Sequence, residues 1–284
     1  MDRSVLSEFE EFLLVDLRRA PSTVKQRLLA VRWFLDHSGG LVSPESIRSY
    51  LKRFLDKSPR TYADQVKALR LFIRDFLGSK LGYNGSWIES FKLPANAPKP
   101  KKLPAWSQVK TFYLTLASKP KSGLKYGALF LLLLSSGMRP EEARSLIIEQ
   151  VDLERRMVLP RHHNPGGTKR SWVTFFSSEA AEALKAWLKV KPPGPQVFKL
   201  NRANMAKAFR RASAQTGVKI HPHLLRSIFA ERLSLAGVPD RYIDALCGRT
   251  PRTELERHYS DYSPENLWRY YRRAEPYLTL GLRL

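Results

Sequence analysis

A histidine and two arginines precede a tyrosine between residues 221 and 262, in an order that suits chemistry on a phosphodiester. His223 and Arg226 are three residues apart and share one face of a helix that Pro222 can begin. Arg249 follows a short helix expected at 240–247, and Tyr259 stands ten residues later. Attack on a phosphodiester adds negative charge to the oxygens of phosphorus, and the planar guanidinium of arginine binds two oxygens at once. The pattern therefore indicates phosphoryl transfer to or from a tyrosine.

A third arginine stands in the segment Ser136-Gly137-Met138-Arg139-Pro140-Glu141-Glu142. Gly137 permits a tight turn and Pro140 suits the first position of the next helix. Arg139 then lies at the mouth of that helix, where its guanidinium and backbone N–H groups face an anion. Glu142, three residues later, can hold the guanidinium in place.

These motifs resemble the active site of the tyrosine recombinases. His-x-x-Arg, Leu-x-Gly with a basic residue, and a tyrosine about ten positions later form its C-terminal half, and Gly-x-Arg-x-x-Glu at 137–142 matches its first motif. Residues 248–252 and His258-Tyr259 are most similar to integrases of archaeal viruses and mobile elements. Most of the wider family has histidine or tryptophan where this chain has Arg249.

The resemblance implies a site-specific recombinase that cuts and rejoins DNA through a 3′-phosphotyrosyl intermediate, without metal, ATP or another cofactor. Lys169, in the loop between two expected strands, is the lysine available to protonate the leaving 5′ oxygen. Glu142 is a supporting residue. The implied catalytic residues are Arg139, Lys169, His223, Arg226, Arg249 and the nucleophile Tyr259.

Other interpretations stay open at this point. Tyr262 is a rival nucleophile three residues after Tyr259, although the spacing from Arg249 favours Tyr259. The chain is alternatively a host recombinase that resolves chromosome dimers, or a non-catalytic DNA-binding relative. A metal nuclease is disfavoured because no paired acidic ligands are evident, and adjacent His162 and His163 point to opposite faces of a strand.

The composition indicates a polyanionic partner. The formal net charge is +23, of which residues 101–284 contribute +17. The single cysteine excludes an internal disulfide and a cysteine-based metal site. The longest apolar run, 126–134, is shorter than the about 20 residues that cross a bilayer, and no signal peptide is evident. We expect a cytoplasmic, nucleoid-associated protein that binds double-stranded DNA and no membrane.

The fold class expected is mainly α with a small β-sheet. Residues 1–92 show helical periodicity and resemble the core-binding domain that covers one face of the DNA in this family. Residues 93–104 are a linker rich in proline and lysine. Residues 105–284 form the catalytic domain, with a buried helix at 126–136 and strands at 157–159 and 171–176.

Basic residues on polar helix faces and in the linker are the expected DNA contacts: Arg60, Lys67, Arg70, Lys99, Lys101, Lys102, Arg202, Lys207 and Arg210. The apolar tail that follows a last helix at 264–274 is expected to pack on a neighbouring subunit. We accordingly expect a homo-multimer that forms a tetramer on DNA.

Overall fold

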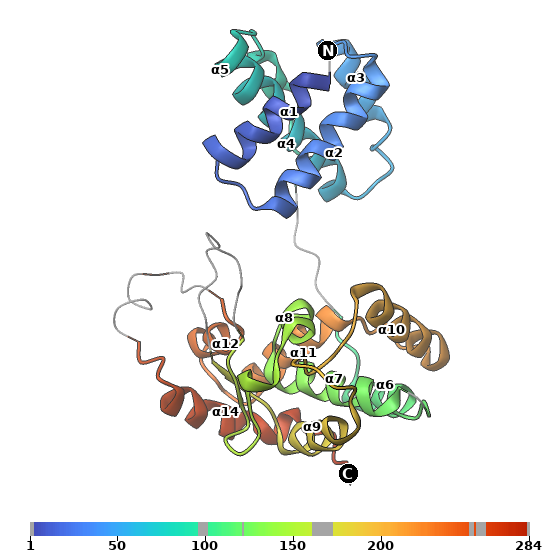
Figure 1. Ribbon diagram of the computed structural model, residues 1–284, viewed down its shortest axis with the longest axis vertical. Helices are drawn as coiled ribbons and strands as arrows, with labels where there is room; N and C mark the ends of the chain where they lie inside the picture. Colours follow the sequence, from blue (N-terminus) through green and yellow to red (C-terminus); the bar gives the residue numbers. More distant parts are fainter. Residues whose placement is uncertain are drawn as a thin grey trace. The chain divides into compact units, whose positions relative to one another are not determined.

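The computed structural model describes residues 3–95, 102–120, 122–160, 173–249, 253 and 260–282 (Figure 1). The chain divides into two compact units, Met1–Lys101 and Lys102–Leu284. Helices dominate both units, and three short strands form one small sheet in the second. The expected fold class is therefore confirmed.

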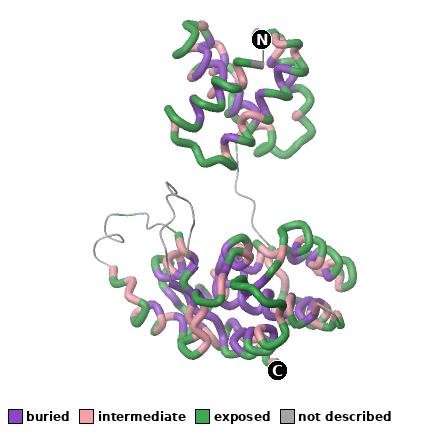
Figure 2. Tube along the Cα trace, in the orientation of Figure 1, coloured by how far each residue is buried: buried purple, intermediate pink, exposed green. Residues whose placement is uncertain are grey.

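The first unit is built from helices packed around an apolar core, which Figure 2 shows on the inner faces. Its aromatic centre includes Phe9, whose ring lies edge-on to Phe72 with the centroids 5.1 Å apart. The elements are α1 (Arg3–Glu11), η1 (Phe12–Asp16), α2 (Pro21–Ser38), α3 (Pro44–Lys52), α4 (Pro59–Arg70), η2 (Leu71–Leu77), α5 (Gly78–Leu81) and η3 (Ser86–Ser90).

Serine and proline begin two of these helices. The Ser43 hydroxyl accepts from the backbone N–H of Ser46, and the Ser58 hydroxyl accepts from that of Thr61. Proline follows each cap at the first helical position, where no N–H is needed. Local chemistry thus fixes where α3 and α4 start.

One buried polar contact ties three helices of the first unit together. The Tyr50 hydroxyl donates to the carbonyl of Ala30 and to Oε1 of Gln65, at 3.3 and 2.9 Å. Its ring is fully buried, and burial raises the pKa of Tyr50 to about 12. The tyrosine therefore stays neutral and links α2, α3 and α4.

The second unit is organised around one buried helix, α7 (Gly123–Ser136). Every residue from Tyr126 to Ser136 is buried, as the apolar run predicts, and α7 packs against α6, α9 and α11 (Figures 1 and 2). The surrounding helices are α6 (Trp106–Ala117), α8 (Pro140–Ser145), η4 (Ile148–Gln150), α9 (Ser178–Val190), α10 (Arg202–Thr216), α11 (Pro222–Leu235), α12 (Asp240–Leu246) and α14 (Pro264–Leu278).

The sheet has the antiparallel order β1 (Val151–Asp152), β2 (Met157–Val158) and β3 (Thr174–Phe175). Val158 pairs with both Val151 and Thr174. The sequence predicts β2 and β3 but not β1, because two residues are too few for an alternating pattern. Helix α9 likewise has no counterpart among the predicted elements. Across the described ranges, no helix has both the length and the apolar character needed to span a bilayer.

The C-terminal tail lies on its own unit. Helix α14 continues through Pro276, and Leu278 and Leu280 are buried. The Glu179 carboxylate accepts from the backbone N–H groups of Leu280 and Leu282, each at 2.7 Å. The expectation of a contact with a neighbouring subunit assumed that the apolar tail has no place in a single chain. That assumption is wrong, because Glu179 of α9 binds the backbone of the tail and Leu280 belongs to the apolar core of the same unit.

Candidate active site

The C-terminal end of α7 forms the frame of the candidate site. A helix leaves its last carbonyls without internal partners, and two of them are satisfied here by side chains from distant elements. The Tyr271 hydroxyl of α14 donates to the carbonyl of Ser135, and the Thr174 hydroxyl of β3 donates to that of Ser136, both at 2.8 Å. Burial raises the pKa of Tyr271 well above its usual value, so the hydroxyl remains a donor.

The next carbonyl, that of Gly137, accepts from Nη1 of Arg226 at 2.7 Å. Gly137 has φ +65°, which closes α7 in the left-handed conformation. A Cβ atom at this position would lie 2.4 Å from Cδ1 of Phe229, one helical turn after Arg226 on α11. Only glycine lets α11 approach closely enough for Arg226 to reach the end of α7.

Arg139 follows this turn and is held by Glu142. One carboxylate oxygen of Glu142 accepts from the backbone N–H of Arg139 and the other from its Nη1, both at 2.7 Å. Nη2 of Arg139 also donates to the carbonyl of Gly248 at 3.4 Å. The Glu142 side chain is 4% exposed and that of Arg139 is 25% exposed, so the guanidinium is fixed but reachable.

Arg249 leaves the end of α12 and is held by Asp244. Its Nη1 donates to the Asp244 carboxylate at 2.5 Å, and its backbone N–H donates to the carbonyl of Asp244 at 2.9 Å. Gly248, with φ +59°, turns the chain between helix and arginine. Burial acts to lower the pKa of Arg249, but the Asp244 hydrogen bond opposes it and the pKa is raised. The Arg249 side chain is 39% exposed.

These three arginines converge, although 110 residues of sequence separate the first from the last. Arg226 is 5% exposed, and burial lowers its pKa, with the charges of Arg139 and Arg249 acting in the same direction. Burial raises the pKa of the Cys247 thiol, which feels all three positive charges. Among the described residues, the ion-pair partners of these three guanidiniums are the two carboxylates of Glu142 and Asp244. Three positive charges beside two negative ones suit the binding of an anion.

His223 lies on the first turn of α11, exposed, on the same helix as Arg226. Pro222 occupies the first helical position, as predicted, and the preceding His221 caps the helix by accepting from the backbone N–H of Leu224 at 3.1 Å. Sequence reasoning did not identify His221 as the cap of this helix. Its position directly before the proline that starts α11 is the local signal for that role.

Lys169 and Tyr259 lie outside the residues that the structure describes. The rival nucleophile Tyr262 is described and is partly buried. Its ring lies edge-on to Tyr242 of α12, with the centroids 6.1 Å apart, and Tyr242 stacks on Tyr270 of α14 at 4.0 Å. Tyr262 therefore has an evident packing role.

Of the expected DNA contacts, Arg60 and Lys67 are exposed on α4, as is Lys102 at the start of the second unit. Arg70 is instead engaged within the first unit. Its guanidinium contacts Glu89 at 3.0 Å and donates to the carbonyl of Phe91 at 2.8 Å. These bonds leave Arg70 little freedom to contact a phosphate.

The remaining expected DNA contacts fall into two groups. Arg202, Lys207 and Arg210 are exposed on α10. Lys99 and Lys101 lie outside the described residues.

Asp244 is the functional candidate that sequence reasoning missed. It stands five residues before Arg249 on an α-helix, where it reads as an ordinary surface acid. A carboxylate one turn before a Gly-Arg pair at a helix end is the local signal that marks it.

Residues 106–265 match the model of the phage integrase family. Tyrosine recombinase XerA of Saccharolobus solfataricus is 25% identical over 222 residues, which cover 73% of this chain and 72% of the relative. Tyrosine recombinase XerC of Bacillus subtilis is 30% identical over 243 residues, 76% of each chain.

Among solved structures, the Tn1549 transposon integrase, in complex with a circular intermediate DNA, superimposes with a TM-score of 0.71 at 15% identity. The match covers 93% of this chain and 97% of that one, and it shows a shared fold. Together with the family model and the arginine cluster, these matches establish that the chain belongs to the phage integrase family and is a tyrosine-type site-specific recombinase.

Proposed function

We propose that the chain cuts and rejoins duplex DNA with Tyr259 as the nucleophile, and that it serves the integration and excision of a mobile element. Arg226 donates to the carbonyl of Gly137 and Arg139 donates to the carbonyl of Gly248, directly before Arg249. This convergence of three arginines carries the proposal. Three fixed guanidiniums suit a five-coordinate phosphorus, whose non-bridging oxygens gain negative charge, without a metal ion.

The steps follow from the residue types. Tyr259 attacks phosphorus and His223 exchanges the phenolic proton, while Lys169 protonates the leaving 5′ oxygen. The 3′-phosphotyrosyl bond keeps the energy of the phosphodiester, so the 5′ hydroxyl of a second strand reverses the step without ATP. Arg249 cannot exchange protons as histidine does, because a guanidinium stays protonated, which leaves proton transfer to His223 and Lys169.

The two units have separate tasks in this proposal. The helical unit, residues 1–92, clamps DNA through Arg60 and Lys67, and the unit from 105 to 284 holds the scissile phosphate. The lysines of the linker 93–104 contribute further phosphate contacts. Four copies assemble on two recombining sites. The complex of the Tn1549 transposon integrase with DNA supports the choice of partner.

A suicide duplex tests the reaction. The duplex carries the candidate attachment site from the element's genome and is nicked beside the cleavage point, so that the released fragment diffuses away. We expect a protein–DNA band in EDTA that survives denaturation, disappears in Tyr259→Phe and persists in Tyr262→Phe. A band that persists in Tyr259→Phe but not in Tyr262→Phe would move the nucleophile. Tight binding with no band would favour a non-catalytic relative.

A host recombinase that resolves chromosome dimers is the second candidate, because the curated relatives are the tyrosine recombinases XerA and XerC. Arg249, in place of the family's usual histidine or tryptophan, favours the mobile element. Deletion of the gene distinguishes the two. Loss of the excised circle and of the empty chromosomal site supports element mobility, whereas accumulation of chromosome dimers supports the host function.

A further inference from the structure

Helix α12 holds the chain on both sides of the proposed nucleophile. Tyr259 stands between Arg249 and Tyr262 in the sequence. The carboxylate of Asp244 on α12 accepts from the Arg249 guanidinium, and its carbonyl accepts from the Arg249 backbone N–H. Tyr242 of the same helix meets the Tyr262 ring edge-on, with the centroids 6.1 Å apart and an interplanar angle of 74°. Both flanks of Tyr259 are therefore held by one helix of seven residues, about 10 Å long.

The downstream flank is a turn with its own hydrogen bonds. The Ser263 hydroxyl accepts from the backbone N–H of Asn266 at 3.4 Å and so caps α14. The Asp261 carboxylate accepts from the backbone N–H of Ser263, and the Asp261 carbonyl accepts from Nδ2 of Asn266, both at 2.8 Å. These bonds hold residues 261–266 to one another. The turn is tied to α12 through Tyr242, which contacts the Tyr262 ring and hydrogen-bonds to the Asn266 side chain.

Tyr242 is itself firmly held, so it can fix the position of Tyr262. It is 6% exposed and belongs to the apolar core cluster that joins α12 to α14, two helices that pack against each other (Figure 1). Its ring stacks on that of Tyr270 with the centroids 4.0 Å apart. Tyr262 is partly buried against the same cluster. The contact between the two rings therefore gives Tyr262 a defined place relative to α12.

Position 262 is close enough to Tyr259 to constrain the nucleophile. Three residues of fully extended chain span at most about 11 Å, so a fixed Tyr262 limits where Tyr259 can lie. Attack on phosphorus requires the phenolic oxygen and the guanidiniums in one arrangement. A misplacement of about 1 Å can slow such a reaction by about 10²-fold.

We infer that Tyr262 and Tyr242 are positioning residues for strand cleavage, because their ring contact sets the position of the nucleophile relative to Arg249. The inference rests on the proposed function for the identity of that nucleophile, Tyr259. The ring of Tyr262 is what the contact requires, and its hydroxyl takes no part. Tyr262 is then neither a rival nucleophile nor a merely structural aromatic residue.

The rate of covalent-complex formation on the suicide duplex tests this inference in the full-length protein. The rate constant is measured at saturating protein, and the affinity for the duplex is measured separately. We expect Tyr262→Ala to lower the rate constant by about 10- to 100-fold with unchanged affinity. Tyr262→Phe, which keeps the ring, should react at the wild-type rate. A wild-type rate in Tyr262→Ala, or a slowing that disappears at saturating protein, would overturn the inference.

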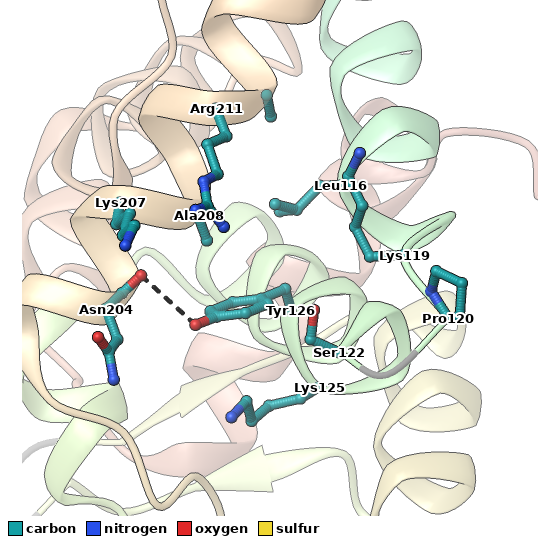
Figure 3. A pocket seen from close by; sticks show the side chains of 11 residues that line it. Leu116, Lys119, Pro120, Ser122, Lys125, Tyr126, Asn204, Lys207, Ala208 and Arg211 are labelled. Carbon is teal, nitrogen blue, oxygen red and sulfur yellow. Dashed lines mark hydrogen bonds between the residues drawn. The ribbon is translucent and has the colours of Figure 1, made fainter.

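Tyr126→Leu is the control for lost stability. Tyr126 lies in the same unit, where its hydroxyl donates to the carbonyl of Asn204 at 3.4 Å (Figure 3), and it belongs to a different apolar cluster from Tyr242. Urea unfolding gives the stability lost in each variant. We expect Tyr126→Leu to lower the free energy of unfolding without slowing the reaction. If the rates of Tyr126→Leu and Tyr262→Ala fall in proportion to stability, the positioning role is refuted.

A double substitution tests whether the two tyrosines act through one contact. In a Tyr242→Leu background, Tyr262→Ala should slow the reaction by a smaller factor than in the wild type, because residues in contact are not additive. Equal factors in the two backgrounds would refute the ring contact as the cause.

The outcomes separate this inference from the proposed function. If the wild-type protein binds the duplex and forms no covalent complex, the proposed function fails and this inference falls with it. If the complex is lost in Tyr262→Phe but not in Tyr259→Phe, the nucleophile is Tyr262 and both are overturned. If the complex requires Tyr259 and forms at the wild-type rate in Tyr262→Ala, only the positioning role is refuted.

Discussion

Replacement of Gly137 by alanine should reveal how tightly α7 and α11 approach at the site. Two costs add at this position. Left-handed backbone costs a non-glycine residue roughly 1–2 kcal/mol, partly offset by a less flexible unfolded chain. The new Cβ also lies 2.4 Å from Cδ1 and 2.6 Å from Cε1 of the fully buried Phe229 ring. Overpacking of this kind costs about 1–3 kcal/mol. We expect Gly137→Ala to lower the free energy of unfolding by about 2–4 kcal/mol.

Gly217 is the matched control. It closes α10 in the same unit with φ +71°, and a Cβ there meets nothing within 4 Å. Gly217→Ala therefore carries the backbone cost alone, about 1 kcal/mol. Urea unfolding of the full-length variants, followed by circular dichroism and tryptophan fluorescence, gives both values. Equal destabilisation by the two substitutions would refute the close approach.

A double substitution tests the cause of the extra cost. Phe229→Leu removes the ring that the added methyl group meets. If the clash is real, Gly137→Ala should cost less in the Phe229→Leu background than in the wild type, because residues in contact are not additive. Strict additivity would place the strain elsewhere in the turn.

Three further predictions concern the ion pairs and a buried phenol. Glu142→Gln should lower the free energy of unfolding by about 3 kcal/mol in urea, because it leaves the Arg139 charge beside other arginines without its buried partner; an unchanged value would contradict this. Asp244→Asn should change the free energy of unfolding by less than about 1 kcal/mol, because the Arg249 side chain is well exposed. The same substitution should slow formation of the covalent complex on the suicide duplex. If Asp244→Asn slows that reaction equally in an Arg249→Lys background, Asp244 does not act through the guanidinium. Because the pKa of Tyr50 is about 12 when folded and about 10 when unfolded, the unfolded state loses the proton first as pH rises. The free energy of unfolding of wild type relative to Tyr50→Phe should then be about 1.4 kcal/mol lower at pH 11 than at pH 9, and a constant difference would refute the shift.

Short-range features of this chain are readable from sequence. The serine caps of α3 and α4, the ion pair of Arg139 with Glu142 and the buried α7 all depend on residues a few positions apart or on one uninterrupted apolar run. Periodicity and cap chemistry act over that range. The family motifs add the order of the candidate site residues along the chain.

Other features depend on contacts between distant segments and leave no local pattern. Glu179 looks like an ordinary acid in the first turn of α9, yet it holds the backbone of the tail, 101 and 103 residues later. Arg70 looks like a free surface cation until the segment around Glu89 folds against it. The pairing of Asp244 with Arg249 is local, but a carboxylate on a surface helix is too common to stand out.

The bonds at the end of α7 also have a kinetic consequence. Its last three carbonyls accept from donors 38, 89 and 136 residues further along the chain. Loop closure over such separations is slow, and contacts of high sequence separation delay folding. A partly folded catalytic unit in which α7 is already helical would still lack the hydrogen bond between Arg226 and Gly137, which positions the Arg226 guanidinium. Refolding followed by hydrogen exchange should then protect the amides of α7 before the ability to form a covalent DNA complex returns.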